Sequence, residues 1–501
     1  MPIEPNYQTF TVDEPLGALT AQTAVECKLP VPSSEIARVL SVSTRVIREG
    51  AEALSGEFRF SGKVLFFVVY ADREGVIKKS ECGVEFQGNG VGEGVLPSTD
   101  LCLEMRAENV KFRPAGDSLY LTAIVTAEAQ AWTPREFRYL FSCENMTVKR
   151  EEVSFLSFAG VIFGESGENA SFDEDTAIGD VLSYYAAASV KETEAGVGAV
   201  TVSGETAFTL LIKTQDGILP LEKKFPFRIE LEENECMPGC TVTADVSVRE
   251  VHFSVTADRE KNTSRVDAEF GLSVCGALYK ESTAEFVTDG FLPDRETAFT
   301  RESVLLLAPG KSREATLRIA QKATAEKTEG GRVIAVLPEN ITVTDVSGKA
   351  GAVAVGGILS ASVFFAEDGA VKALSPELPF TAEIPFPGAE AGKKYVVRLF
   401  IESVSAEFLS GEEGGLALTA TVRAVCTEEV SQTLAFITEA EEGETRPALT
   451  GAVTVCFAEK GAGLWELSKS LGVPPEEVMK NNPELRFPTE GSERILIYKP
   501  L

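Results

Sequence analysis

Apolar and polar residues alternate with a period of two along most of this chain, which is the side-chain spacing of β-strands. The run Val-Leu-Phe-Phe-Val-Val-Tyr, residues 64–70, is apolar at every position, so both faces of this strand are expected to be buried. Strand pairs that turn at Gly, Asp or Asn follow it, as in residues 109–132. Short strands without helical segments between them predict β-sandwiches.

This strand pattern occurs three times. In each copy, beginning near residues 60, 202 and 355, one glycine precedes an apolar run, and a second glycine closes the next turn 13 positions later. The glycine pairs are Gly62 and Gly75, Gly204 and Gly217, and Gly356 and Gly369. The repetition predicts three successive β domains of one type.

The limits of the predicted domains lie where this pattern starts again, near residues 146 and 297. A further limit is the acidic run 439–450, which combines like charges with a proline and has no apolar face, as is typical of a flexible linker. The chain is therefore expected to be mainly β, with three tandem β-sandwich-like domains, an acidic linker and a small terminal module. The corresponding ranges are 1–146, 147–297, 298–438, 439–450 and 451–501.

After the linker, the hydrophobic period changes from that of strands to that of helices. Leucines recur at i, i+3 and i+7 before a glycine that can end the helix, and a proline suits the first turn of a second helix. Short alternating runs at 453–457 and 494–498 flank the helices, so the predicted order is β-α-α-β. The residues that define the two helices are Leu464, Leu467, Leu471, Gly472, Pro475 and Asn482.

Composition excludes several classes of function. The 501 residues carry a net charge of −29, which argues against binding nucleic acid or an anionic membrane, since both need clustered Lys and Arg. No apolar run approaches the ~20 residues that a transmembrane helix needs. The acidic first residues do not form a signal peptide. We therefore expect no transmembrane segment and a cytoplasmic location.

Residue types that support catalysis or metal binding are scarce. His252 is the only histidine and falls in a predicted strand, so neither a Ser-His-Asp triad nor a His-rich metal centre can be assembled. Of the nine scattered cysteines, the closest pair is Cys236 and Cys240, and no second pair or nearby histidine completes a zinc site. We expect reduced thiols, no enzymatic activity, no catalytic residue, no cofactor and no metal.

The terminal module resembles a LysM domain. Its segments Gly461–Leu467, Val478–Asn482 and Gly491–Ile497 follow the family's G-D-T-L-W-x-I, L-x-x-x-N and closing-strand patterns. One departure is Ala462-Gly463, which replaces the Asp-Thr of the family and removes a helix cap and polar groups from a loop that lines the groove in carbohydrate-binding members. Because sugars are fixed by well-placed hydrogen bonds, this departure weakens the glycan-binding interpretation.

The three repeats resemble SPOCS domains of the DUF3794 type, through the V-x-G strand, the turn closed by glycine and the apolar strand that follows. SPOCS domains ahead of one terminal LysM domain resemble the SipL-type spore coat morphogenetic proteins of endospore-forming clostridia. In that family the LysM domain docks on the ATPase of the coat's basement layer, at the outer forespore membrane inside the mother cell. The resemblance implies a non-enzymatic scaffold of the spore coat, with that ATPase and other coat proteins as partners.

Two other functions stay open. The module can bind peptidoglycan or another N-acetylglucosamine glycan, or it can be a dispensable remnant within an envelope protein. For both binding interpretations, the loops around the two helices form the expected site, and Trp465 is either a core anchor or part of the binding edge. The predicted site residues are Gly461, Ala462, Gly463, Leu464, Trp465, Asn482, Pro483 and Glu484.

Overall fold

The computed structural model describes residues 3–258, 260–323, 331–409, 415–446, 453–491 and 493–498. Strands make up most of this part of the chain, and two short α-helices lie near its C-terminal end. The protein is therefore mainly β, as the alternating pattern predicted.

The first repeat consists of two antiparallel three-stranded sheets that face each other across one core. Its sheets have the strand orders β1-β6-β5 and β2-β3-β4, and a 3-10 turn at Ser33–Glu35 leads from β1 into β2. The strands are β1 (Glu4–Pro32), β2 (Ile36–Leu54), β3 (Glu57–Asp72), β4 (Ile77–Val91), β5 (Asp100–Ala115) and β6 (Ser118–Glu144).

The second and third repeats have the same plan. In the second, the sheets have the orders β10-β9-β8 and β11-β12-β7; in the third, they are β13-β19-β18 and β14-β15-β16, with β17 also paired to β15. The second repeat contains β7 (Thr147–Glu174), β8 (Ile178–Ala195), β9 (Ala199–Thr214), β10 (Gly217–Glu232), β11 (Thr241–Asp258) and β12 (Thr263–Phe291). The third contains β13 (Arg295–Ala323), β14 (Arg332–Lys349), β15 (Ala352–Glu367), β16 (Ala370–Leu374), β17 (Glu377–Pro385), β18 (Lys394–Phe408) and β19 (Leu416–Thr445).

The observed limits differ slightly from the predicted ones. A bend at Pro293 and Asp294 separates β12 from β13, so the predicted limit at 297 falls inside β13. The limit near 146 falls between the end of β6 and the start of β7.

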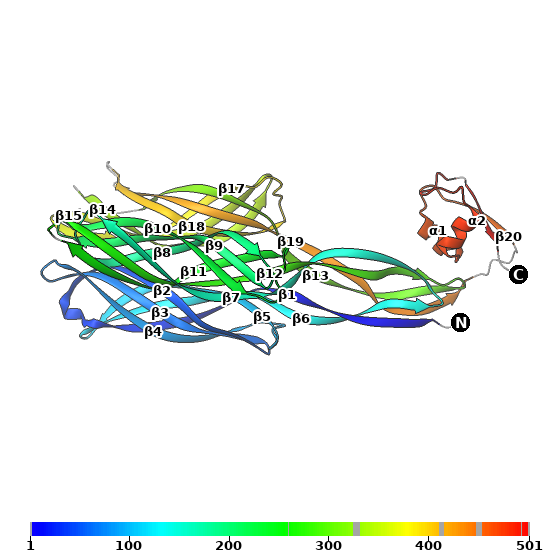
Figure 1. Ribbon diagram of the computed structural model, residues 1–501, viewed down its shortest axis with the longest axis horizontal. Helices are drawn as coiled ribbons and strands as arrows, with labels where there is room; N and C mark the ends of the chain where they lie inside the picture. Colours follow the sequence, from blue (N-terminus) through cyan, green and yellow to red (C-terminus); the bar gives the residue numbers. More distant parts are fainter. Residues whose placement is uncertain are drawn as a thin grey trace.

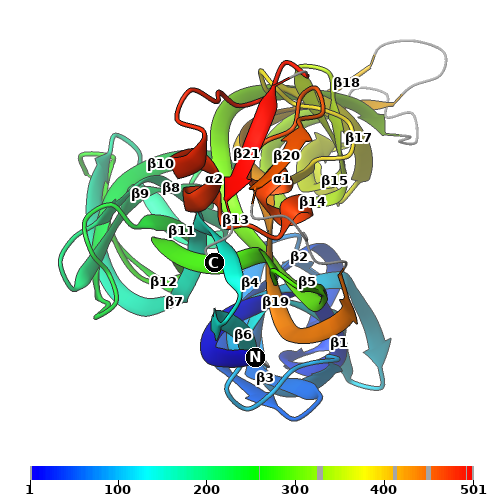
Figure 2. The same ribbon diagram turned by 90° about the vertical axis from the view of Figure 1, so that its right-hand side faces the viewer.

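The three repeats surround a common axis, as the view along the molecule in Figure 2 shows. At this axis the central strands β3, β9 and β15 contribute Val69, Leu211 and Phe364, which are buried in one cluster drawn from all three repeats. On the other face of β3, Val64 and Phe66 fill the core of the first repeat. The strand is therefore buried on both faces, as predicted, because the neighbouring repeats cover its second face.

The glycine that precedes each apolar run allows a close approach of backbone and aromatic ring. A Cβ atom on Gly62 or Gly204 would lie 2.3 or 2.1 Å from a carbonyl oxygen of the preceding strand and would also meet a phenylalanine ring. In the third repeat, Gly357 has this environment, with Thr342 O at 2.3 Å, whereas Gly356 makes only ordinary contacts. The assignment of Gly356 to the repeat was therefore wrong by one position, because two adjacent glycines leave the register ambiguous in sequence.

The first and last strands of each repeat are 27 to 30 residues long and continue beyond the sandwiches as a stalk. Figure 1 shows the stalk on the right, with the N-terminus at its end. Aromatic rings from all three repeats pack inside it, with centroid separations of 5.1 to 5.8 Å. These rings belong to Phe10, Phe137, Phe286 and Phe436. The sequence pattern predicted the strands but not this shared extension.

The acidic run predicted as a flexible linker is partly a strand. β19 continues to Thr445, and its acidic residues pair with β13, for example Glu439 with Thr300 and Glu442 with Thr297. Ala440 is buried between the acids, and Glu442 forms an ion pair with Arg295 at 2.9 Å. The like charges are tolerated because alternate side chains point to opposite faces of the strand. Residues 447–450 lie outside the described part of the chain.

The terminal module has the predicted order of elements, namely β20 (Val453–Phe457), α1 (Leu464–Leu471), α2 (Pro475–Asn481) and β21 (Arg494–Tyr498). Its two strands pair antiparallel. Gly472 ends α1 in a left-handed conformation with φ of 63°, and Pro475 occupies the first turn of α2. Within the ranges given above, no helix combines the length and the apolar character needed to cross a membrane.

Candidate functional site in the terminal module

The module has a hydrophobic core of its own. Leu467 from α1, Val478 from α2 and Ile495 and Ile497 from β21 are buried together, and Leu464 and Leu471 pack at the edge. The leucine stripe predicted for the first helix therefore faces the inside of the module, not the interior of the third repeat. This core fixes the loops at the ends of the two helices.

Asn482 is a structural residue of this core, although the sequence placed it in the binding site. Its side chain is 8% exposed. Its amide nitrogen donates to the carbonyl oxygens of Val478 and Leu496 at 2.8 and 2.9 Å, and its side-chain oxygen accepts from the Leu496 backbone at 2.7 Å. Asn482 thus ties the end of α2 to β21, and its side-chain amide is bonded within the module.

The other predicted site residues differ in accessibility. Gly461, Pro483 and Glu484 are exposed. Ala462, Gly463, Leu464 and Trp465 are half-buried. The accessible part of the predicted site is therefore one residue of the first loop and the two residues that follow Asn482.

Thr489 holds the first of these loops in place. The Gly461 backbone donates to the Thr489 carbonyl oxygen at 2.7 Å, and the Ala462 backbone donates to the Thr489 hydroxyl at 3.1 Å. The N-terminal end of α1 has no side-chain cap, as expected from Gly463 at that position. Thr489 thus accepts hydrogen bonds from backbone N–H groups of the loop, for which the loop's own side chains provide no acceptor. It lies in an irregular segment, where no periodic pattern marks it.

Trp465 and Lys469 fasten α1 to the stalk through Asp289 of β12. The Trp465 indole nitrogen donates to Asp289 Oδ2 at 2.9 Å, and Lys469 Nζ lies 2.7 Å from both carboxylate oxygens. The Trp465 ring also packs edge-on against Phe291, with the centroids 5.4 Å apart. The sequence allowed Trp465 to be a core anchor or part of the binding edge; in the structure its side chain contacts the protein's own stalk.

The end of α1 lies close against the same part of the stalk. A Cβ atom on Gly472 would come within 2.5 Å of the Pro293 carbonyl oxygen, so only glycine fits here. Arg446, just after β19, donates to the Lys469 carbonyl oxygen at 2.7 Å. The module is therefore docked by polar, aromatic and close backbone contacts together.

Asp289 is ionised in this arrangement. Partial burial raises the pKa of its carboxyl, but the hydrogen bonds from Lys469 and Trp465 outweigh that effect and hold the pKa below its usual value. The side chains of Lys469 and Asp289 are 36% and 21% exposed, so solvent weakens their attraction without removing it.

The two-stranded sheet of the module presents an apolar outer face. Val453, Val455 and Phe457 on β20 and Tyr498 on β21 are all about half exposed or more, and β-pairing places Tyr498 beside Val453. The opposite face of the sheet covers the module's core. A cluster of apolar side chains on one face of so small a module is typical of an interaction surface.

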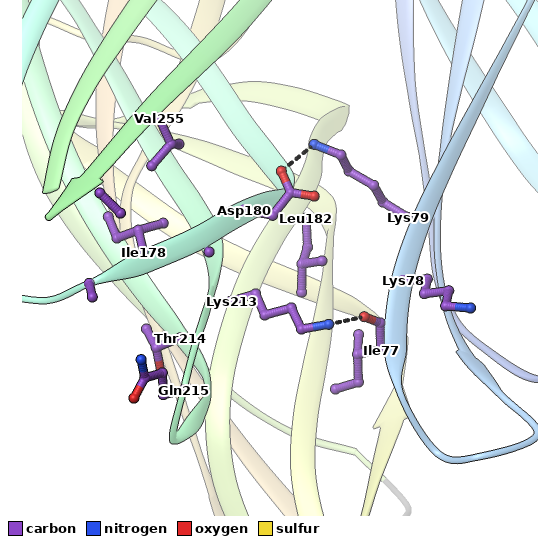
Figure 3. Close-up of a pocket in the computed structure, with 13 residues that line it drawn as sticks. Ile77, Lys78, Lys79, Ile178, Asp180, Leu182, Lys213, Thr214, Gln215 and Val255 are labelled. Carbon is purple, nitrogen blue, oxygen red and sulfur yellow. Dashed lines mark hydrogen bonds and ion pairs between the residues drawn. The ribbon is translucent and has the colours of Figure 1, made fainter. Parts of the chain in front are cut away.

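A cavity of about 760 Å³ lies between the first and second repeats. Figure 3 shows Lys79 and Lys213 reaching across the junction. Lys79 pairs with Asp180 at 2.7 Å, and Lys213 donates to the Ile77 carbonyl oxygen at 2.9 Å. Lys78 pairs with Asp72 at 2.8 Å. Lys79 and Lys213 thus join the two repeats, whereas Lys78 pairs within the first repeat, so the cavity belongs to the repeat junction.

His252 lies in β11, as predicted, on an exposed position opposite Glu269. Across the described ranges, no group of three or more His, Cys, Asp or Glu side chains is arranged to hold a metal ion.

These features define an all-strand body of three sandwich repeats that carries a small β-α-α-β module at the end of a stalk. Residues 331–409, which include β14 to β18, match the family described as SipL, SPOCS domain. This part of the third repeat is therefore similar to the SPOCS domains of that family, which indicates a sporulation-related protein. The match includes neither the first two repeats nor the terminal module. No curated protein and no solved structure matches the chain.

Proposed function

We propose that this protein is a non-enzymatic scaffold in spore coat assembly. The observation that carries the proposal is the similarity of residues 331–409 to the SipL, SPOCS domain family. The triplicated body supports it, because three repeats packed around one axis offer several outer faces on one particle. Several weak contacts on one particle raise the effective concentration of each and can hold an assembly together.

The terminal module is, in this proposal, a LysM domain that captures a protein partner. The partner is the ATPase of the coat's basement layer, at the outer forespore membrane in the mother cell. The accessible loop residues Gly461, Pro483 and Glu484 are the proposed contact positions. The backbone donors of Gly461 and Ala462 are already bonded to Thr489, which favours a protein partner over a sugar that needs free donors.

Localisation during sporulation tests the scaffold role. A fluorescent fusion of the full chain is expected to surround the forespore of an endospore-forming host, and a chain without residues 447–501 is expected to stay diffuse in the mother cell. If the shortened chain surrounds the forespore and the coat assembles normally, the module is dispensable and the proposed capture is wrong.

Binding by the purified full chain separates the protein partner from a glycan. We expect the chain to bind the purified coat ATPase and to remain in solution when peptidoglycan sacculi are pelleted. Reversing the charge of the exposed loop acid, Glu484→Lys, should weaken ATPase binding at least tenfold, whereas Glu476→Lys on the exposed side of α2 should not. Sedimentation with peptidoglycan, without ATPase binding, would establish the glycan-binding alternative.

A further inference from the structure

Two cysteines from different repeats meet at the junction of the first and second repeats. Cys102 of β5 and Cys275 of β12 are 173 positions apart in sequence, yet their sulfur atoms are 2.6 Å apart. Both residues are buried, with 9% and 8% of their surface exposed. Sequence spacing gave no reason to pair them.

The alternation of side chains along the two strands brings these cysteines together. On β5, Leu103 points into the core of the first repeat, so the neighbouring Cys102 points outward; on β12, Val274 points into the second core and Cys275 points outward. Beside the sulfur atoms, Trp132 and Phe158 stack across the same junction with centroids 4.4 Å apart. The two sulfur atoms are therefore held together by the packing of both sandwiches.

The surroundings make the two thiols unequal. Arg48 places its guanidinium nitrogen 3.6 Å from Cys275 Sγ. The hydrogen bond from Cys102, together with the charge of Arg48, lowers the pKa of the Cys275 thiol, although burial opposes this. The hydrogen bond to Cys275 and burial raise the pKa of the Cys102 thiol. Cys275 is thus the nucleophile of the pair, and Cys102 holds a proton next to it.

We propose that Cys102 and Cys275 form a redox-modification site, at which a small hydroperoxide converts the two thiols into a disulfide that joins the first repeat to the second. The Cys275 thiolate attacks one peroxide oxygen, the O–O bond breaks, and a sulfenic acid and hydroxide form. The Cys102 sulfur then displaces the hydroxyl group from the Cys275 sulfur. Its proton leaves with that group as water.

The step balances as two thiols and one hydrogen peroxide giving one disulfide and two waters, with peroxide as the two-electron oxidant. The sulfur atoms have to approach from 2.6 Å to only about 2.0 Å, so the sandwiches need little movement. A small oxidant is required because the two side chains leave little access from solvent. This inference does not depend on the proposed function.

The test is mass spectrometry of the full chain after treatment with hydrogen peroxide. We expect the intact mass to fall by two hydrogen atoms, a peptide linked through Cys102 and Cys275 to appear in a non-reducing digest, and dithiothreitol to reverse both changes. Thermal unfolding of the oxidised chain should move to a higher temperature, because the link closes a long loop in the unfolded chain. Absence of the linked peptide at every peroxide dose that preserves the far-ultraviolet circular dichroism would overturn the proposal.

Variants locate the site. Cys102→Ala and Cys275→Ala should each abolish the linked peptide and the rise in unfolding temperature. Cys426→Ala, which removes a buried thiol from the core of the third repeat, should leave both effects intact. If either site variant does not fold, digestion of the treated wild-type chain still decides the matter, because it identifies the linked residues directly.

Discussion

Removing the carboxylate of Asp289 should release the terminal module from the stalk. This side chain accepts from the Trp465 indole and from Lys469, and it is the polar centre of the docking contact. Asp289→Ala leaves both donors without a partner but does not touch the module's own core, which lies on the other side of α1. The module should therefore stay folded and lose its fixed position.

The size of the effect follows from these contacts. Hydrogen bonds to a charged group contribute about 1.5–3 kcal/mol each in mutational series. Lys469 and Asp289 are partly exposed, which reduces the ion-pair contribution. We estimate a combined loss of about 2 kcal/mol, which lowers the docking equilibrium constant about 30-fold.

Tryptophan fluorescence is a suitable assay, since the chain has only two tryptophans and Trp132 is buried between the first two repeats. Undocking exposes Trp465 to water, so the emission of Asp289→Ala should shift to longer wavelength at neutral pH. Glu281→Ala, at an exposed position of the same strand, should leave the emission unchanged. Circular dichroism should report equal strand content in all three proteins.

Acid should have the same effect as the substitution. Because the pKa of Asp289 is lowered in the docked state, its contribution is fully present above the ordinary aspartate value of about 3.9 and is lost as the pH falls through the lowered value. Wild-type emission should shift in that range, whereas that of Asp289→Ala should not shift further. Identical spectra of wild type and Asp289→Ala at neutral pH would refute the reasoning, since Trp465 would then be held without the carboxylate.

Three further substitutions test other parts of the structure. Gly472→Ala should undock the module, which would appear as the same emission shift, and the left-handed backbone should cost about 1–2 kcal/mol. The control Gly461→Ala has a similar backbone strain but no stalk contact, so its emission should stay at the wild-type wavelength. Gly62→Ala should lower the free energy of unfolding by about 1–3 kcal/mol in urea titration, because a methyl group overfills the close approach to β2; Gly167→Ala, in open surroundings on a strand, should change it far less. Asn482→Ala should destabilise the module by about 2–3 kcal/mol and accelerate amide exchange in β21, because it leaves buried backbone groups unbonded. If amide exchange is unchanged while partner binding is lost, Asn482 acts in binding and not in holding the module together.

Local periodicity was sufficient to predict the mainly β character of the chain and the two helices of the module. Leu464, Leu467 and Leu471 are an example, because the inward face of a short helix depends only on spacing along the chain. Gly472 is another, because the end of a helix is set by neighbouring residues.

What periodicity could not predict depends on partners distant in sequence. The acids at 439–445 indicated a linker, but their strand exists because β13 pairs with it. Trp465 docks on Asp289, which lies 176 positions earlier, and no local pattern connects the two. The same limit applies to Asn482, whose role as an internal tie depends on the position of β21.

The three repeats are unequal where they meet, which explains how one chain specifies their order. At the axis, the three repeats contribute side chains of different volume, namely Val69, Leu211 and Phe364. Each lies seven positions after the equivalent glycine of its repeat, which is Gly62, Gly204 or Gly357. Interiors are close-packed, so three valines at this point would leave a void and three phenylalanines would overfill it. One small, one intermediate and one large side chain fill the space together.

Away from the axis, charged side chains at the junctions also differ from repeat to repeat. Arg398 of the third repeat pairs with Asp245 of the second, and Glu104 of the first lies beside them; burial raises the pKa of the Asp245 carboxyl, and Arg398 opposes this rise. Glu104, Asp245 and Arg398 lie on β5, β11 and β18, which have the same place in the three repeats. An assembly of three identical repeats would therefore bring together three like charges at this junction, each partly removed from water, and the repulsion would oppose assembly. Joining the repeats in one chain allows each to carry a different side chain at these positions. The differing side chains at these contacts therefore determine which repeat packs at which position around the axis.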